Sequence, residues 1–255
     1  MSIGTKVGTD QCDSVPDVDL LFSIVIGVYN DWMPLHECLR SLTLQSGAPS
    51  FEVIIVDDGS ADPAPDFIRD WSRHFTLVLV RQSHAGVSAA RNRGARISKG
   101  PVLVFADADS RFQKRCLETL ASAITQSPQH NSFQLCLTGD CSTLVGRVEE
   151  LRLITLQKHL LQPNGCLRYL NTAGFAIRRT HVNIEAGVFD TVALRAEDTL
   201  LLANLIERGE LPLFVASAIV QHETPFSLME CLRKDIRSAY LELCLLYTSP
   251  SPRDS

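Results

Sequence analysis

Residues 101–109 read PVLVFADAD, a run of apolar residues that ends in two aspartates. Such a short, continuous apolar run is typical of a strand that is buried on both faces of a parallel sheet. The same design occurs twice upstream, in FSIVIGVYND at residues 22–31 and in FEVIIVDD at residues 51–58. Ligands bind at the carboxyl ends of the strands in open α/β sheets, so the polar residues that follow each run are the first candidates for a site.

Segments with helical spacing separate these strands. Helices are expected from Pro34, over residues 66–74 and over residues 87–98, with a further strand, TLVLV, at residues 76–80. Strands that alternate with helices predict right-handed βαβ units, and therefore an α/β fold with a Rossmann-like, mostly parallel central sheet flanked by helices. The second half predicts helices over residues 113–126, 147–161 and 196–208, strands over residues 133–137, 173–177 and 213–220, and an amphipathic helix from Ser227 onward.

The domain organisation is expected to be simple. Residues 1–20 are predicted to be a disordered N-terminal segment, and residues 21–243 one compact domain without repeats or a long linker. Residues 244–254, CLLYTSPSPRD, resemble a translated sequencing adapter, so residues 244–255 are interpreted as a non-native tail on a truncated chain. A Pro- and Ser-rich disordered tail is the alternative.

Composition narrows the class of protein. With 45% hydrophobic and 21% charged residues, the 255-residue chain can bury a full core, and its net charge of -5 argues against a nucleic-acid partner. The eight cysteines form no CxxC pair, which is typical of a reducing compartment. No signal peptide or membrane-spanning run is found, so we expect a cytoplasmic protein. The alternative is a protein at the cytoplasmic face of a membrane, attached through a missing C-terminal part.

The strongest local signal for chemistry is the pair Asp107 and Asp109. In an extended segment two residues that are two apart point the same way, and two carboxylates at one sheet edge repel unless a cation compensates. Hard oxygen ligands suit Mn²⁺ or Mg²⁺. The alternative is that these acids cap a turn, but their position after a buried strand favours the metal.

The acids after residues 51–56 suggest a different use. A carboxylate of Asp57 or Asp58 can accept a hydrogen bond from the N–H group of a nucleotide base, and Gly59 permits close approach of the backbone. The alternative is a turn, because Asp-Asp-Gly-Ser is favourable turn chemistry whatever its function. These residues alone leave the two interpretations equally open.

Five motifs occur in the order and approximate spacing of family 2 glycosyltransferases of the GT-A fold, which this chain resembles from about Phe22 to Leu241. They are SIVIGVYN, VIIVDDGS, HAGVSAARNRGARISKG, VLVFADAD and AEDTLLLANLIERG. The resemblance implies inverting transfer of a sugar from a nucleotide-diphosphate donor, usually a UDP-sugar, to an acceptor hydroxyl. Two departures are Gly27, where the family often has Pro or Thr, and Ser110, where a third acid is frequent.

The resemblance also implies residue roles. Asp109 is the expected direct metal ligand, with Asp107 and His222 beside it, and Asp107 also belongs to the nucleotide site. Gly174 is similar to a glycine that lets the backbone run close to the donor sugar. The remaining nucleotide-binding residues are expected to be Tyr29, Asp57, Asp58, Gly86, Arg91 and Asn92.

The family's catalytic base lies in an acidic pair that corresponds to Glu197 and Asp198. We expect Asp198 to take the proton of the acceptor hydroxyl and Glu197 to assist it. From the residues alone, acids that open a helix are favoured by the helix dipole, which is the simpler interpretation.

Three other functions compete with this hypothesis. A nucleotidyltransferase would show a Gly-rich basic loop after the first strand, which VYNDWMP is not. A catalytically inactive nucleotide-sugar binding protein would lack the base or the metal acids, and both are present. A structural partner-binding protein would expose an apolar surface unrelated to the acids. The expected partners are therefore a nucleotide-sugar donor and a glycan, lipid-linked or small-molecule acceptor.

Overall fold

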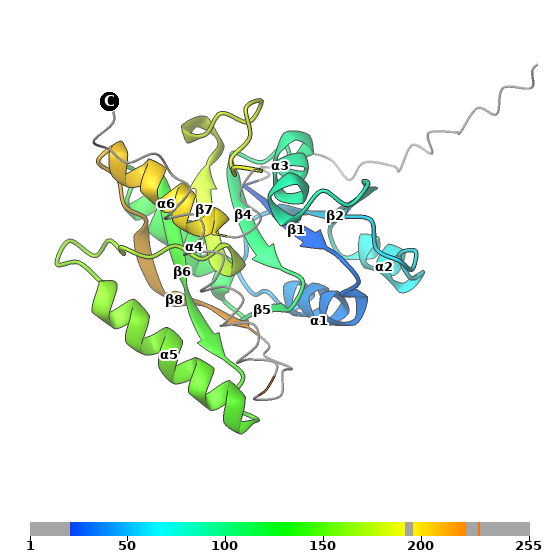
Figure 1. Cartoon of the computed structure of the whole chain (residues 1–255), viewed down its shortest axis with the longest axis horizontal. Helices are drawn as coiled ribbons and strands as arrows, with labels where there is room; N and C mark the ends of the chain where they lie inside the picture. The colour runs from blue at the N-terminus through cyan, green and yellow to red at the C-terminus, as the bar shows by residue number, and fades with distance from the viewer. Residues whose placement is uncertain (1–20, 192–195, 223–228, 230–255) are drawn as a thin grey trace, which may run out of the picture.

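The computed structural model describes residues 21–191, 196–222 and 229. Within them, eight strands form one sheet in the order β3-β2-β1-β4-β7-β6-β8-β5 (Figure 1). The predicted helix after Ser227, apart from Met229, and both chain termini lie outside the described residues. The strands are β1 (Phe22–Val28), β2 (Phe51–Asp57), β3 (Thr76–Arg81), β4 (Val102–Asp107), β5 (Ser110–Phe112), β6 (Ser132–Gly139), β7 (Phe175–Arg178) and β8 (Leu213–His222).

Helices cover both faces of the sheet, which confirms the α/β class. In Figure 1, α1 and α3 lie on opposite sides of β1, and α5 runs along the part of the sheet that contains β6. The helices are α1 (Trp32–Thr43), α2 (Phe67–Asp70), α3 (Val87–Ile97), α4 (Cys116–Gln126), α5 (Leu144–Leu160) and α6 (Glu197–Glu207), with short 3₁₀ turns η1 (Trp71–Arg73), η2 (Thr172–Gly174) and η3 (Arg179–His181).

The parallel half of the sheet brings three strand ends level with one another. β1 pairs in parallel with β2 and β4, and β2 pairs in parallel with β3. In this register Val28 lies opposite Asp57, and Gly27 lies opposite Asp107. The polar residues that follow β1, β2 and β4 are therefore neighbours at one edge.

The other half of the sheet is mixed rather than parallel. β7 is antiparallel to both β4 and β6, whereas β8 is parallel to β6 and antiparallel to β5. The sequence did not predict β5, because three residues are too few for a periodic pattern. β8 also continues two residues beyond its predicted end at residue 220, to His222, because residues 220–222 pair with β5.

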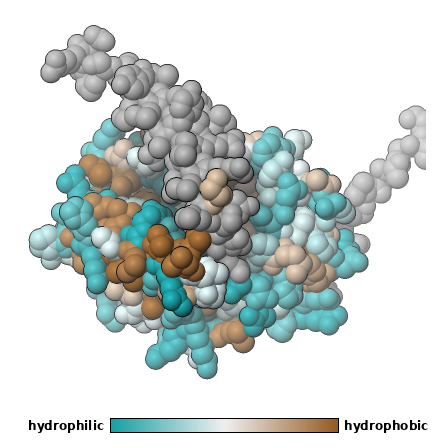
Figure 2. Space-filling model, turned by 60° about the horizontal axis from the view of Figure 1, so that its bottom comes forward, coloured by the Kyte–Doolittle hydropathy of each residue, from teal (hydrophilic) through white to brown (hydrophobic). Residues whose placement is uncertain are grey.

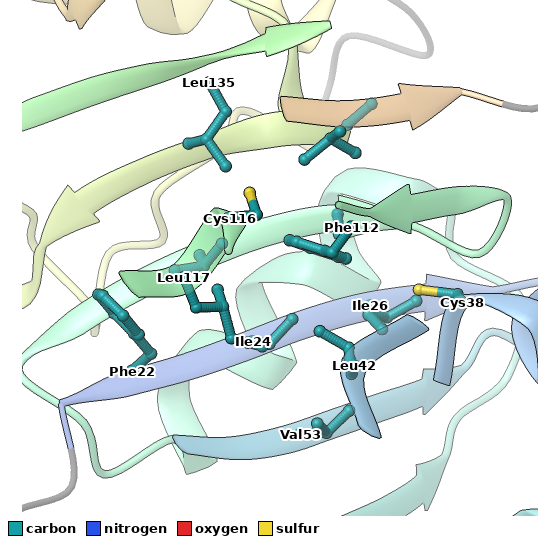
Figure 3. Packing of buried hydrophobic residues seen from close by; sticks show 14 of the residues in the cluster. Phe22, Ile24, Ile26, Cys38, Leu42, Val53, Phe112, Cys116, Leu117 and Leu135 are labelled. Atoms are coloured by element: carbon teal, nitrogen blue, oxygen red, sulfur yellow. The ribbon is translucent and has the colours of Figure 1, made fainter. Parts of the chain in front are cut away.

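Alternating side chains of β1 build two cores, one on each face. Phe22, Ile24 and Ile26 pack with α1 and α4 in one cluster, and Val25 packs with α3 in the other. Figure 3 shows the first cluster, with Ile26 near Cys38 of α1 and Ile24 near Leu117 of α4. Burial on both faces explains the continuous apolar run of this strand.

One helix carries an exposed apolar stripe. Leu144, Val148 and Leu151 of α5 are 77%, 59% and 65% exposed, at helical spacing on one side of the helix. Figure 2 shows the face to which α5 belongs, with hydrophobic patches among polar residues. Among the described residues, no helix is long and apolar enough to cross a membrane.

Candidate active site

The turn after β2 is held by Asp57. Its buried carboxylate accepts a hydrogen bond from the Ser60 amide at 2.8 Å and lies 3.4 Å from the Arg81 guanidinium. Asn30, after β1, is tied to the same turn through Ser60 Oγ at 2.9 Å and the Ala61 amide at 2.8 Å. Asp57 thus stabilises the loop in which Asp58 lies.

Asp58 orders the segment that leads into α3. Its Oδ1 accepts hydrogen bonds from Gln82 Nε2 at 2.7 Å and the Ala85 amide at 2.9 Å. Its Oδ2 accepts from the Gly86 amide at 2.9 Å and lies 2.9 Å from His84 Nδ1. The carboxylate is almost fully buried, so it fixes the position of the first turn of α3.

An aromatic surface lies beside this carboxylate. Tyr29 is 46% exposed, and its ring stacks on His84 with a centroid distance of 4.3 Å. Gly86 caps α3 with a φ of 92°, a conformation that strongly favours glycine, and among the described residues no atom lies within 4 Å of the position that a Cβ would occupy there. Tyr29, Asp58 and Gly86 are thus brought together at one edge, as their predicted role requires.

Asp107 and Asp109 flank a tight turn between β4 and β5. Ala108 between them is buried in the core, and Ser110 Oγ accepts a hydrogen bond from the Asp107 amide at 3.1 Å. The same hydroxyl donates to the Ala173 carbonyl at 3.1 Å. Ser110 therefore anchors the turn to η2, which gives a structural reason for a residue that departs from the family pattern.

His222 reaches these acids because β8 pairs with β5. In that register His222 lies opposite Ser110, and its Nε2 is 3.3 Å from Asp109 Oδ1 and 3.9 Å from Asp107 Oδ2. Ligand atoms of the three residues all lie within 4.8 Å of one another. Two carboxylate oxygens and one imidazole nitrogen at this spacing fit a divalent cation such as Mn²⁺.

Arg91 connects this cluster with the acidic start of α6. The guanidinium is 3% exposed, and it donates to Asp107 Oδ1 at 2.6 Å and to Glu197 Oε1 at 2.8 Å. Burial disfavours its charge, but Asp107, Asp198 and Glu197 outweigh this effect and raise the pKa of Arg91. A permanent positive charge therefore lies between Asp107, a candidate metal ligand, and Glu197, the neighbour of the candidate base.

Asp198 has the most perturbed carboxyl group of the site. Burial raises its pKa to about 6, while Arg91 opposes the shift and Glu197 adds to it. Oδ2 accepts a hydrogen bond from the Thr172 amide at 3.3 Å, and the buried Oδ1 has no hydrogen-bond partner among the described residues. A carboxylate with an unused oxygen and a pKa near neutrality is suited to accept a proton.

Two predicted residues are engaged with the protein itself. The amide of Asn92 is directed at the backbone of Val188 and Phe189. Gly174 is buried, and a side chain there would meet Leu137 and Leu135 of β6, so close packing is the reason for this glycine. Their predicted contacts with nucleotide and donor sugar remain predictions.

Two residues that had no predicted role also shape the site. Asp31 is the N-cap residue of α1, and its pKa is raised by burial and by the nearby Asp107. The Phe189 ring lies under the Arg91 guanidinium, 5.6 Å from its central carbon to the ring centroid. Asp31 directly follows the motif that ends β1, which was an available signal, whereas Phe189 follows no motif.

Solved structures define the class to which this fold belongs, the GT-A fold. The structure superposes on Staphylococcus aureus TarS residues 1–349 in complex with UDP-GlcNAc with a TM-score of 0.67 and 20% identity, over 82% of this chain and 60% of that one. It superposes on the mannosyltransferase PcManGT of Pyrobaculum calidifontis in complex with GDP-Man and Mn²⁺ with a TM-score of 0.67 and 17% identity, over 95% and 69%. At these identities the likeness establishes the fold.

The chain belongs to glycosyl transferase family 2, whose domain matches residues 23–184. It is 34% identical over 99 residues to the uncharacterized glycosyltransferase YibD of Escherichia coli K12, covering 38% of this chain and 28% of that protein. It is 40% identical over 90 residues to validoxylamine A glucosyltransferase of Streptomyces hygroscopicus subsp. limoneus, covering 34% and 20%. The chain thus matches less than a third of the length of either relative.

Proposed function

We propose that this chain transfers a sugar, with inversion, from a nucleotide-diphosphate donor to an acceptor hydroxyl with the help of Mn²⁺ or Mg²⁺. One observation carries the proposal: the buried Arg91 bridges Asp107, a member of the cluster with Asp109 and His222, and Glu197, the residue next to Asp198. This arrangement provides a cation site for a diphosphate and a base for an attacking hydroxyl within one site. Membership of the family and the nucleotide sugars bound in the two solved structures support it.

The nucleotide is expected at the carboxyl ends of β1 and β2. The exposed ring of Tyr29 offers a surface on which a base can stack, and Asp58 offers an acceptor for a base N–H. The carboxylate of Asp58 already faces four donors, so a base must replace one of them. His84, whose side chain is 58% exposed, is the donor that can move aside. The imide of uracil fits this exchange, which favours a UDP-sugar.

The diphosphate is expected at the turn between β4 and β5. Asp109, Asp107 and His222 would hold the ion, and a bound divalent cation would neutralise charge that develops on the leaving diphosphate. Arg91 orients Asp107 by donating a hydrogen bond to its Oδ1. Ser110 fixes the turn from the other side, so both acids are positioned before a ligand arrives.

Asp198 is positioned to receive the acceptor proton. Inversion requires the acceptor oxygen to attack the anomeric carbon from the side opposite the diphosphate, so the base must lie across the sugar from the metal site. The Thr172 amide holds one oxygen of Asp198, and the other is available to accept the proton. Glu197 is paired with Arg91, which makes it a support for this geometry rather than the base.

A donor screen tests the proposal. UDP- and GDP-sugars are offered with Mn²⁺, and binding and hydrolysis are compared in the parent protein, in Asp109→Ala and in Asp70→Ala, an exposed acid of α2 that serves as a matched control. Asp109→Ala and chelation are expected to weaken donor binding at least roughly tenfold, and Asp70→Ala to leave it unchanged. Donor binding that is insensitive to both treatments would refute the metal assignment, and the anomeric configuration of the product tests inversion.

A further inference from the structure

Two consecutive residues of α3 hold the two ends of the segment that leads into α6. At one end, Asn92 Oδ1 accepts hydrogen bonds from the amides of Val188 at 2.8 Å and Phe189 at 2.9 Å, and Nδ2 donates to the Phe189 carbonyl at 2.7 Å. At the other end, Arg91 donates to Glu197, the first residue of α6, at 2.8 Å. α3 therefore holds residues 188–189 as well as the first residue of α6.

The Asn92 end is tightly packed. The side chain is 3% exposed, and a Cβ added to Gly187 would lie 2.8 Å from Asn92 Nδ2. Three of the four hydrogen-bonding positions of the amide are thus used on one short stretch of backbone. A nucleotide could reach this amide only by displacing that backbone.

The segment held by Asn92 also supports Arg91. Phe189 contacts the Phe105 ring edge to face at a centroid distance of 4.9 Å and lies under the Arg91 guanidinium. Ala196, at the far end, has a φ of 73°, a strained conformation for a residue with a side chain. Such strain persists only where the surroundings fix the backbone, and the hydrogen bond from Arg91 to Glu197 lies at the next residue.

We propose that Asn92 is a positioning residue for the base side of the site and makes no contact with the nucleotide. By clamping residues 188–189 it fixes Phe189, through Phe189 it fixes Arg91, and together they set the position of Glu197 and Asp198 at the start of α6. This inference rests on the proposed function for its catalytic consequence. The clamp itself is independent of any activity.

Hydrogen exchange tests the clamp directly. Asn92→Ala removes the acceptor of the Val188 and Phe189 amides, so exchange in a peptide covering residues 187–191 is expected to accelerate at least about tenfold. Asn92→Asp retains the acceptor oxygens and should preserve much of the protection. Arg93→Ala, at the neighbouring position of α3, is the matched control and should leave this peptide unchanged. Unchanged exchange in Asn92→Ala would overturn the proposal.

Kinetics separate positioning from nucleotide binding. The kinetics are measured with Mn²⁺ and the UDP-sugar found in the donor screen. Asn92→Ala is expected to keep the affinity for UDP and the donor KM within about twofold of the parent values. Its kcat for hydrolysis is expected to fall at least about tenfold, because displacement of the base slows the chemical step. Asn92→Asp should recover part of the kcat. A tenfold loss of UDP affinity in Asn92→Ala would overturn the inference. If the parent protein binds no UDP and hydrolyses no nucleotide sugar, the proposed function fails, and the exchange result still decides the clamp.

Discussion

At the scale of single residues, Asp198 combines two properties that rarely coincide by chance. Its carboxyl group is buried, which raises its pKa to about 6, and one of its oxygens has no hydrogen-bond partner among the described residues. Leaving such an atom without a partner costs folding free energy, so a functional reason is expected. A carboxylate that gains a proton near neutral pH is well matched to general-base catalysis.

Substitution of this acid is expected to remove turnover and retain donor binding. Asp198→Asn keeps the shape of the side chain and removes the basic oxygen, so kcat should fall by about 10²- to 10⁴-fold. Steady-state kinetics with the donor, together with titration of UDP, measure the two effects. Turnover at the level of the parent protein would exclude Asp198 as the base.

The pH dependence of turnover follows from the same group. A general base acts in its ionised form, and because the pKa of Asp198 is raised to about 6, kcat/KM should rise with pH through that value and then level off. The profile is measured with a non-titrating buffer mixture at constant Mn²⁺. An acid limb that remains at a much lower pH, close to the ordinary carboxyl value, would contradict this assignment.

Arg91 is expected to matter for folding as well as for catalysis. It is buried between Asp107 and Glu197, so Arg91→Met would leave two carboxylates without their shared partner. The expected loss is about 3 kcal/mol in the free energy of unfolding. Urea denaturation measures it, and Arg93→Met, at the more exposed neighbouring position, should cost much less. Equal losses of unfolding free energy in the two variants would show that the ion pairs of Arg91 with Asp107 and Glu197 contribute little to stability.

At the scale of elements, α3 organises the site because it can approach the sheet closely. Gly94 faces β1, and a Cβ at this position would clash with the Val25 side chain. The glycine lets α3 lie near enough to β1 for Arg91 to reach Asp107. The small residues in GVSAARNRGA therefore serve packing, and the packing positions the charged residues.

A side chain at Gly94 is expected to push α3 away from the sheet. Gly94→Ala should lower the free energy of unfolding by about 1–3 kcal/mol, although alanine is the better helix former, because overpacking a tight core outweighs propensity. Thermal or urea unfolding measures the change, with the exposed Arg96→Ala as the control in the same helix. A stabilised Gly94→Ala variant would show that the core can relax around the added methyl group.

At the scale of the whole molecule, the site joins two differently built halves of one sheet. The parallel half supplies Asp58 and Asp107, and the mixed half supplies His222 through the pairing of β8 with β5. α6 then places Asp198 beside η2, where the Thr172 amide holds it. The proposed chemistry therefore depends on both halves of the fold at once.

Stability is expected to reflect the burial of Asp198. The pKa of Asp198 is 3.8 in the unfolded reference and about 6 in the fold, so between these values the folded state retains a proton that the unfolded state has lost. This contribution to stability is therefore lost as pH rises through that window, by about 1–3 kcal/mol. Asp198→Asn should be more stable than the parent at about pH 7, and the difference should vanish at about pH 4. Urea denaturation at both values is the measurement, and a difference that does not change with pH would point to another cause.

Much of the parallel half could be predicted from the sequence, whereas boundaries in the second half were less accurate. β1, β2 and β4 are buried on both faces, so their apolar runs are continuous and easy to recognise. α5 begins at Leu144, three residues before its predicted start, because Thr143 caps it by accepting a hydrogen bond from the Gly146 amide at 2.9 Å. The predicted helix over residues 113–126 begins only at Cys116 because β5 and the turn after it precede the helix.

The sequence by itself determined the fold class and supplied candidate residues for the site. Asp107 and Asp109 could be chosen because a local pattern shows where a buried strand ends. Asp198 was expected to be the base only through the resemblance to the family, since acids that open a helix are favoured by the helix dipole alone. Only the tertiary structure decided their partners. β8 pairs with β5, Arg91 bonds to both Asp107 and Glu197, and Asn92 bonds to residues 188–189. These contacts join segments as many as 112 positions apart (residues 110 and 222). Such long-range contacts leave no periodic pattern in either segment.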